Sequence, residues 1–382
     1  MDCHASVNAC TPCSARASSA SGAAVNHAAL AVVVSGFPRR SETFALNELL
    51  ALDAAGMLGP VFATKPGDTG HQQPDHERLL RRVEVLPAAT PADQAALVAQ
   101  RLKGSSLMGI HGYFAHTPAE VASLAARRLG VAHGFSVHAR DARKVSPEDL
   151  VARSRSAACV IACNPDVAAD VGRFGVGTQL IPHGVDVTRF QPGPLPAAEP
   201  LRLLAVGRLV EKKGFSVLLA ALELVEIPCT LRIIGEGPER DGLQARIESS
   251  GLRDRVSLCG PMTHAQLPAE YAAVHVVVVP SVVDRSGDRD GLPNVVLEAM
   301  ASQRAVVASD IAAIASAVEH GETGLLVPPG DPAALAAAFH EVAANTTLVE
   351  HLGRNGRRRV EAEFELGRCT QRLIHHLRTA YA

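Results

Sequence analysis

The chain has 382 residues, of which 47% are hydrophobic and 3% aromatic, and its 37 Lys and Arg against 39 Asp and Glu give a formal net charge of −2. This length exceeds what one hydrophobic core usually holds and suits two α/β domains. The scarcity of aromatic side chains, with no Trp and no basic excess, argues against a nucleic-acid partner, because no stacking surface is available.

The first 26 residues are small, polar and rich in Ala and Ser, which predicts a disordered extension. Cys10 and Cys13 form a CxxC there, but no second CxxC or paired histidine completes a zinc set, so no metal site is expected. The apolar run 28–37 is too short for a membrane span and predicts the first core strand. We therefore expect a cytoplasmic protein whose remaining cysteines are reduced and mostly buried.

Histidines in the N-terminal half follow predicted strands. His138 comes directly after the apolar run 131–137, at a carboxyl strand end, where parallel sheets bind ligands. A lone histidine is more often structural, so its position alone does not assign a function. His111 and His116 are alternative contacts for an acceptor, whereas His183 is expected to organise the connection between the domains.

The segment 181–200 is rich in Pro and Gly and predicts that connection. It separates an N-terminal, acceptor-side domain (27–190) from a C-terminal, nucleotide-binding domain (191–368). The last helical stretch, 369–382, is expected to pack back on the N-terminal domain. A flexible connection would allow the domains to close over a substrate and exclude water.

A basic pair follows the first strand of the C-terminal domain. The run 202–209 predicts a strand that ends at Gly207, where the backbone can approach a ligand closely. Arg208 stands at its carboxyl end and Lys213 opens the next helix. Arg binds a diphosphate bidentately and Lys acts as a mobile point charge, although a plain basic surface patch is an equal alternative for the isolated motif.

The next strand, within 230–240, ends in Gly235-Glu236-Gly237. The glycine spacing is not that of the dinucleotide-binding fingerprint, because the next glycine after Gly237 is Gly242. The turn still predicts a close approach at a strand end, where main-chain groups could hold a nucleobase.

An acidic pair lies on the other side of the same predicted domain. The run 275–281 predicts a buried strand, and a Gly-rich loop carrying Asp290 leads to a helix that begins at about Pro293. Neither Gly291 nor Leu292 can cap this helix with a side chain, so its first N–H groups are available to phosphate or sugar oxygens. Glu298 leans back toward the same place and suits a hydroxyl pair, although a solvated helical Glu is the plainer alternative.

Taken together, these motifs resemble a known family. Arg208, with the segments 235–240, 290–301 and 309–338, resembles the C-terminal domain of family 4 of the retaining glycosyltransferases, and 35–49 and 133–141 resemble its exopolysaccharide-building subgroup, such as the colanic acid transferases. The likeness covers about residues 28–375. It implies the α/β GT-B fold, two facing Rossmann-like domains with the active site in the cleft between them.

The resemblance also implies roles for single residues. Arg208 and Lys213 would neutralise the leaving diphosphate, Glu298 would bind the ribose, and Gly36 would belong to a loop that approaches the diphosphate. His138 would face the sugar and help to stabilise oxocarbenium-like charge. The motifs and the resemblance together predict a catalytic set of His138, Arg208, Lys213 and Asp290 and a donor-binding set of Gly36, Gly207, Gly235, Glu236, Gly291, Leu292, Pro293, Asn294, Val295 and Glu298.

One departure from the family concerns Asp290, where the family usually has Glu. The side chain is one methylene shorter, so contact with a sugar hydroxyl needs a closer approach or a water. Because the acid group is kept, the change indicates a tuned site and not an inactive one.

The implied reaction moves a sugar from a UDP-, GDP- or ADP-sugar to a glycan or lipid-linked acceptor in cell-surface or exopolysaccharide synthesis. The configuration would be retained by same-face attack, without a metal or cofactor, through positioning and charge stabilisation. The alternatives are a sugar-nucleotide epimerase or phosphorylase on the same fold, or a non-catalytic binder of nucleotide sugars. The basic segments 78–86 and 125–130 are candidates for peripheral membrane contact on the inner face, or ordinary solvated helices.

Overall fold

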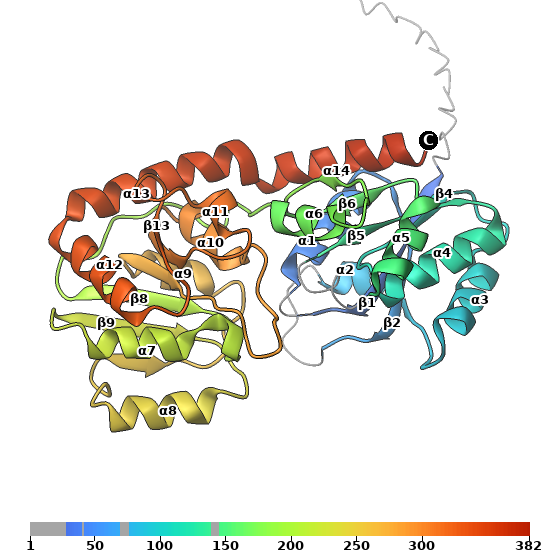
Figure 1. Ribbon diagram of the computed structural model, residues 1–382. Helices are drawn as coiled ribbons and strands as arrows, with labels where there is room; N and C mark the ends of the chain where they lie inside the picture. Colours follow the sequence, from blue (N-terminus) through green and yellow to red (C-terminus); the bar gives the residue numbers. More distant parts are fainter. Residues whose placement is uncertain (1–27, 40–41, 69–75, 139–144) are drawn as a thin grey trace, which may run out of the picture.

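The computed structural model describes residues 28–39, 42–68, 76–138 and 145–382, and within them two parallel β-sheets form the centres of two α/β domains (Figure 1). The expected N-terminal extension lies outside the described residues. The expected α/β architecture with two domains, each built on a parallel sheet, is confirmed. The predicted domain boundaries at 190 and 368 stay a prediction.

The N-terminal sheet has seven strands in the order β3-β2-β1-β4-β5-β6-β7. Its strands are β1 (Ala29–Phe37), β2 (Leu58–Pro66), β3 (Val83–Val85), β4 (Leu107–Gly112), β5 (Ala132–Val137), β6 (Val160–Ala162) and β7 (Gln179–Leu180). The helices between them are α1 (Thr43–Ala54), α2 (His76–Leu80), α3 (Pro91–Leu102), α4 (Thr117–Leu129), α5 (Pro147–Arg155) and α6 (Pro165–Gly172). Because all pairings are parallel, the carboxyl ends of the strands meet at one edge.

The C-terminal sheet has six parallel strands in the order β10-β9-β8-β11-β12-β13. Its strands are β8 (Leu201–Val206), β9 (Cys229–Ile234), β10 (Val256–Leu258), β11 (Val276–Val279), β12 (Ala305–Ser309) and β13 (Leu325–Val327). The helical segments are η2 (Glu211–Lys213), α7 (Phe215–Glu223), α8 (Arg240–Ser249), α9 (Leu267–Ala272), α10 (Asn294–Ala301), α11 (Ile314–Ala317), α12 (Pro332–Ala344), α13 (Thr346–Arg359), η3 (Val360–Phe364) and α14 (Leu366–Ala380).

Both sheets are covered on both faces, which explains their continuous apolar runs. In β11, Val276 and Val278 point into one core cluster and Val277 and Val279 into the cluster on the opposite face. The predicted strand 275–281 is therefore present, shorter at both ends. The strand predicted at 202–209 ends at Val206, one residue before Gly207, because the chain turns there into the loop that carries the basic pair.

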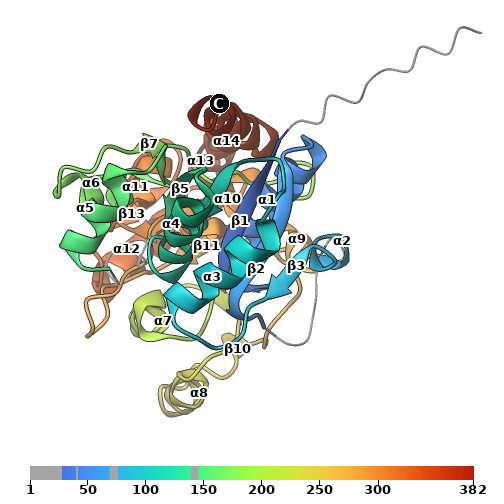
Figure 2. The ribbon, with the colours of Figure 1, turned by 90° about the vertical axis from the view of Figure 1, so that its right-hand side faces the viewer.

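Helix α14 runs from the C-terminal domain onto the N-terminal one. In Figure 1, α13 and α14 extend along the top of both domains, and Figure 2 shows α14 beside β1 and α1. Leu373, Leu377 and Tyr381 are buried in the same cluster as side chains of β1 and α1. The Tyr381 ring packs over Gly109 of β4 and its hydroxyl lies over Gly134 of β5, so a Cβ added at either glycine would overlap this side chain. The N-terminal core thus includes residues from the far end of the sequence.

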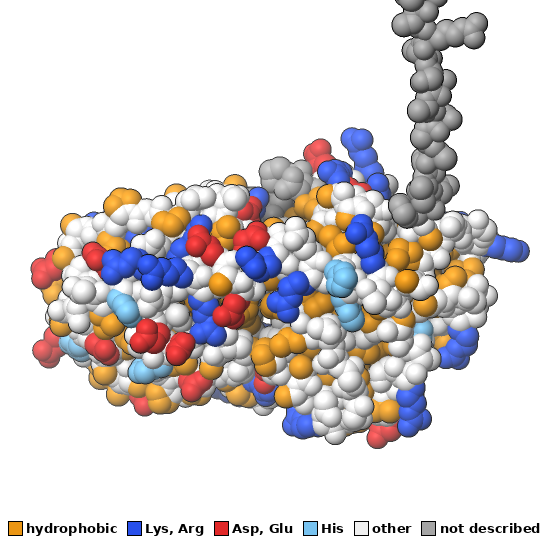
Figure 3. Space-filling view, turned by 90° about the horizontal axis from the view of Figure 1, so that it is seen from above, with side chains coloured by type: hydrophobic (Ala, Val, Ile, Leu, Met, Phe, Trp, Pro, Cys, Tyr) orange, Lys and Arg blue, Asp and Glu red, His pale blue; other side chains and the backbone are white. Residues whose placement is uncertain are grey.

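Among the helices of the described residues, none is both long and apolar enough to cross a bilayer. The face that α13 and α14 present, seen from above in Figure 3, carries Lys and Arg side chains among Asp and Glu side chains. Four of the five described cysteines, Cys159, Cys163, Cys229 and Cys369, are buried, as expected, and Cys259 is half-buried.

Candidate functional site

One member of the basic pair and one of the acidic pair, Lys213 and Asp290, are in direct contact. The Lys213 Nζ lies 2.7 Å from Asp290 Oδ2, and Lys212 Nζ lies 3.2 Å from both Asp290 Oδ1 and Asp288 Oδ2. The expectation that the pairs lie on opposite sides of the domain was wrong, because β8 and β11 are neighbours in the sheet and their loops leave the same edge. The sequence reasoning also missed Lys212, although it adjoins Lys213.

A glycine makes this contact possible. Gly214 has φ +67°, and a Cβ there would overlap the Pro280 carbonyl oxygen, so only glycine lets the β8 loop lie against the β11 loop. The loops are also joined by a hydrogen bond from the Val282 N–H to the Lys212 carbonyl, 2.9 Å long. Lys213 ends the 3-10 turn η2 and does not open α7, which begins at Phe215 after this left-handed glycine.

Contacts within the protein account for two further positions that were predicted to bind the donor, Gly235 and Glu236. Gly235, with φ +152°, crosses so close to Gly207 that a Cβ would overlap the Gly207 carbonyl, so this close approach is between two protein loops. Glu236 is exposed and lies 3.7 Å from Arg240, and its carbonyl accepts from the Leu209 N–H. Arg208 is exposed and makes no side-chain hydrogen bond or ion pair with the residues that the structure describes.

The charges around Asp290 make its ionised form stable. Burial on its own would raise its pKa, but Lys213 and Lys212 together lower the pKa below the ordinary 3.8. A lowered pKa in the folded protein means that this interaction stabilises the fold above about pH 3.8 and is lost as the pH falls through the folded-state value.

We therefore expect Asp290→Asn to lower the free energy of unfolding at neutral pH by at most about 3 kcal/mol. This is the low end for the loss of one partner of a buried ion pair, because both lysine side chains keep some contact with solvent. Chemical denaturation of both proteins between pH 2.5 and 7 measures this, and the difference should shrink toward the acid end. A constant difference across that range would contradict the assignment.

The next part of the site is the N-terminus of α10. Pro293 is its N-cap and Asn294 its first residue, one later than predicted, and no side chain caps it. The positions from Gly291 to Val295, including Leu292, therefore form the stretch at which the first N–H groups of the helix emerge. The Asn294 amide donates to Thr43 Oγ1 of the N-terminal domain at 3.1 Å, so this helix end also joins the two domains.

Glu298, one turn further, is buried and held by side chains that the sequence reasoning missed. Its Oε2 accepts from the Tyr271 hydroxyl at 2.7 Å, and its Oε1 lies 3.2 Å from His264 Nε2. Arg189 Nη1 lies 2.6 Å from the other ring nitrogen of His264, so we assign the His264 proton to Nε2. Each carboxylate oxygen keeps a second lone pair for a ligand hydroxyl.

A crevice between the domains reaches Glu298. It is lined from the N-terminal side by Thr43, Phe44 and Asn47 of α1 and from the C-terminal side by His264, Asn294 and Glu298. Its volume of about 10 Å³ is no more than the roughly 10–15 Å³ that a single water needs, far too little for a nucleotide sugar. Arg289 closes the cleft further, because its Nη2 lies 2.7 Å from Asp166 Oδ1 of α6. A ligand that reaches Glu298 therefore requires the domains to separate.

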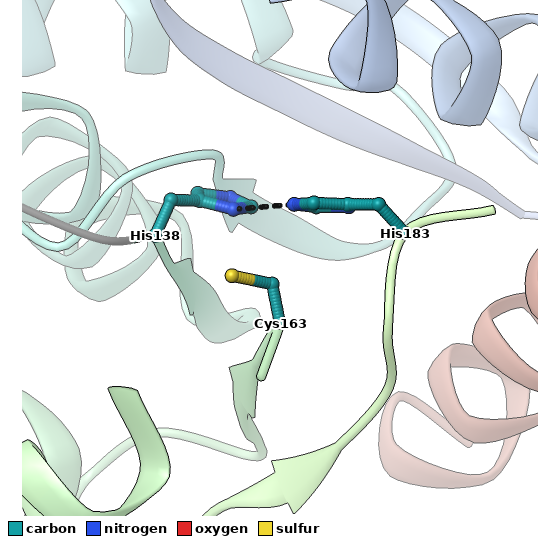
Figure 4. Close-up of side chains that lie close together, drawn as sticks. All are labelled: His138, Cys163 and His183. Atoms are coloured by element: carbon teal, nitrogen blue, oxygen red, sulfur yellow. Dashed lines mark hydrogen bonds between the residues drawn. The ribbon is translucent and has the colours of Figure 1, made fainter. Parts of the chain in front are cut away.

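Across the cleft, His138 stands directly after β5, as predicted, and is buried. Its Nδ1 lies 3.1 Å from His183 Nε2 (Figure 4). His183 Nδ1 lies 2.6 Å from Glu48 Oε1 of α1. Glu48 also accepts from the Tyr113 hydroxyl. The expectation that His183 organises the interdomain connection understated its role, because it links His138 to a buried carboxylate.

The pKa directions in this chain of groups assign its protons. Burial holds the pKa of His138 well below its ordinary value. Burial would also lower the pKa of His183, but the Glu48 carboxylate and the Cys163 sulfur, through charge and hydrogen bonding, raise it to about 10. His183 is then protonated at neutral pH and donates through Nε2 to Nδ1 of a neutral His138, whose own proton is on Nε2. His138 thus acts as a neutral hydrogen-bond donor and not as a cation.

Three other N-terminal predictions need correction or restatement. Gly36 lies inside β1 and not in a loop, and a Cβ there would press on the Pro66 carbonyl of β2, so strand packing explains it. His111 lies inside β4 with both ring nitrogens bonded, to Tyr381 at 3.0 Å and Ser136 at 2.9 Å, which removes it as an acceptor contact. His116 precedes α4 and stacks on Phe114.

Comparison with known proteins places this site in context. Residues 200–345 match the family of group 1 glycosyl transferases. The chain is 36% identical over 188 residues to WcaL of Escherichia coli (strain K12), a glycosyltransferase named for colanic acid biosynthesis, and the match covers 47% of this chain and 46% of that protein. It is 33% identical over 169 residues to the amylovoran biosynthesis glycosyltransferase AmsK of Erwinia amylovora, and this match covers 44% of this chain and 42% of that protein. The matched part thus spans less than half the length of these curated relatives.

Structural similarity extends over both domains. The crystal structure of Anabaena HepE in complex with UDP superposes with a TM-score of 0.78 at 19% identity, covering 92% of this chain and all of that one. HepE has also been solved in complex with UDP-glucose. At this identity the likeness establishes the fold alone.

Proposed function

We propose, starting from the group 1 glycosyl transferase domain of residues 200–345, that the protein transfers a sugar from a nucleotide-diphosphate sugar to a glycan or lipid-linked acceptor in cell-surface polysaccharide synthesis. The observation that carries the proposal is the convergence at one sheet edge of exposed Arg208, Lys213 and the uncapped N-terminus of α10. Three positive groups at one place suit a leaving diphosphate. The UDP complexes of HepE and the names of the polysaccharide-building relatives support this donor class and role.

In this proposal the second domain supplies the leaving-group chemistry. Arg208 binds the diphosphate oxygens, and Lys213 turns from Asp290 to the phosphate as negative charge develops there. The Asp290 carboxylate, released from Lys213, accepts from a sugar hydroxyl while Lys212 keeps its other oxygen in place. Glu298 binds the ribose hydroxyls with the lone pairs that Tyr271 and His264 leave open.

The N-terminal domain supplies the other side of the sugar. His138, neutral and protonated on Nε2, donates a hydrogen bond to the sugar, and the Glu48–His183 pair fixes that tautomer. The departing phosphate oxygen takes the acceptor proton, so attack and departure occur on one face and the configuration is retained. This transfer proceeds without a metal, and a chelator should leave it intact.

Incubation of the purified protein with labelled UDP-, GDP- and ADP-sugars and a bacterial membrane extract tests the proposed function. Transfer of label to lipid or polymer supports a glycosyltransferase. Free isomerised sugar would indicate an epimerase instead, and binding without turnover would indicate a non-catalytic protein. Nuclear magnetic resonance of the product bond reports whether the configuration is retained.

Glu298→Gln is expected to raise the KM for the donor by about 10- to 100-fold with kcat within a few-fold, because a hydrogen bond to a charged acceptor contributes about 1.5–3 kcal/mol. Steady-state kinetics at saturating acceptor measures both constants. Glu270→Gln is the matched control, since Glu270 of α9 pairs with Arg232 of β9 and does not line the crevice. An unchanged KM in a folded Glu298→Gln protein would remove the ribose assignment.

A further inference from the structure

Three potential metal ligands lie together at the carboxyl edge of the N-terminal sheet. His138 follows β5, Cys163 follows β6 and His183 follows β7, so three successive neighbouring strands each deliver one residue. One ligand atom from each lies within 4.8 Å of the others. Figure 4 shows the two rings facing each other edge to edge and the Cys163 sulfur beside them, below the His138 ring in this view.

We propose that His138, Cys163 and His183 form a binding site for one thiophilic divalent cation of the zinc class. The inference goes beyond the proposed transfer reaction, which uses no metal. Two imidazoles and one thiolate are a ligand set that zinc prefers, and three protein ligands leave the fourth position to solvent.

The distances fit a tetrahedral ion. Zinc–nitrogen bonds of about 2.0–2.1 Å place two nitrogen ligands about 3.3 Å apart. His138 Nδ1 and His183 Nε2 are already 3.1 Å apart. The Cys163 sulfur lies at most 4.8 Å from the two nitrogens. A movement of the sulfur by on the order of 1 Å would allow a zinc–sulfur bond of about 2.3 Å.

The surroundings resemble the outer shell of a metal site. A histidine ligand usually donates its second ring N–H to a carboxylate, which fixes the ring, and His183 Nδ1 makes this contact with Glu48 at 2.6 Å. The Phe44 ring stacks on His183 at 4.1 Å and shields the pair from solvent. The divalent charge would be balanced by the Cys163 thiolate and the Glu48 carboxylate, giving a net charge of zero in a mostly buried place.

Binding exchanges protons for the ion. The metal replaces the proton between the two rings and the thiol proton of Cys163, and both protons go to the buffer. The His183 side chain is 16% exposed, which gives the ion a route from the cleft. The ion would sit on Nδ1 of His138 and leave the Nε2–H in place, but it would add positive charge beside the sugar, where oxocarbenium-like charge develops. Zinc should therefore inhibit transfer; this consequence rests on the proposed function, whereas the binding site does not.

Titration of the metal-stripped full chain with Co²⁺ alone tests the site, since a thiolate ligand gives a charge-transfer band in the near ultraviolet. We expect one equivalent to bind and zinc to displace it. Cys163→Ser should abolish the band. His183→Gln should abolish cobalt binding although the Cys163 thiol is still present. Glu48→Gln should weaken zinc binding about 10- to 100-fold.

Matched controls exclude the other thiols. The Cys10→Ser/Cys13→Ser double variant removes the CxxC, and Cys259→Ser removes the half-buried thiol; both should keep the band. Thermal unfolding confirms that each variant is folded. No band in the parent protein, a band that survives in Cys163→Ser, or a band lost with Cys10 and Cys13 would each overturn the proposal.

Activity gives a second, separate result. Zinc should lower transfer by the parent, and a chelator should restore it. Transfer by Cys163→Ser, whatever its rate, should stay at its zinc-free value. A cobalt band without any transfer would support the metal site and reject the proposed function, so the two can fail independently.

Discussion

Replacing Lys213 by Ala is expected to lower kcat by about 10²- to 10³-fold, the usual cost of removing one preorganised group that stabilises developing charge. In the structure Lys213 pairs with Asp290 at 2.7 Å, and its side-chain carbons lie beside Gly207, about 3.3 Å from the position of a Cβ there. It is therefore held at the strand end where the diphosphate is proposed to bind. Single-turnover measurements with saturating donor report the chemical step directly.

Lys212→Ala is the matched control for this prediction. Lys212 also contacts Asp290, at 3.2 Å, and Asp288, at 3.2 Å, so its removal takes away two ion pairs and the same side-chain volume. We expect Lys212→Ala to change kcat less than 10-fold and both variants to unfold near the parent temperature. Near-normal turnover in folded Lys213→Ala, or equal losses in the two variants, would reject the diphosphate role of Lys213.

Replacing Tyr381 by Ala is expected to lower the free energy of unfolding by about 3–5 kcal/mol, as other truncations of large buried aromatic side chains do. The ring fills the space over Gly109, and the hydroxyl lies over Gly134. Its hydroxyl donates to the Ile110 carbonyl at 3.2 Å and lies 3.0 Å from His111 Nδ1. Chemical denaturation followed by circular dichroism gives the loss.

Tyr381→Phe separates packing from hydrogen bonding. It keeps the ring and removes the hydroxyl, so buried His111 loses one partner, which costs about 1–3 kcal/mol. Exposed Arg378 of the same helix provides a control, because Arg378→Ala should change stability by less than about 0.5 kcal/mol. If Tyr381→Ala were no worse than Arg378→Ala, the end of α14 would not belong to the N-terminal core.

Much of this architecture follows from local patterns. The apolar runs around Val276–Val279 and Ala132–Val137 predict buried strands because both sheet faces are covered, and the position of Glu298 within α10 follows from helical geometry. Pro293 marks the start of α10 to within one residue. These features depend on neighbouring residues only.

Contacts between distant loops were not predictable in this way. The Glu48–His183–His138 chain joins residues 135 and 45 positions apart, and no periodicity encodes which loops meet. The same holds for His264 and Tyr271 beside Glu298. The close approaches at Gly36 and Gly235 were expected to involve a ligand, whereas the structure fills both with neighbouring backbone.

The return of α14 to the first domain also bears on how the chain folds as it is made. A ribosome releases the strands β1 to β7 long before Leu373, Leu377 and Tyr381, yet these three side chains complete the core around β1 and α1. The N-terminal domain must therefore wait, with part of its apolar surface uncovered, until the C-terminal domain has been synthesised. Domains usually fold in the order of synthesis; here the first domain to emerge is the last to be finished.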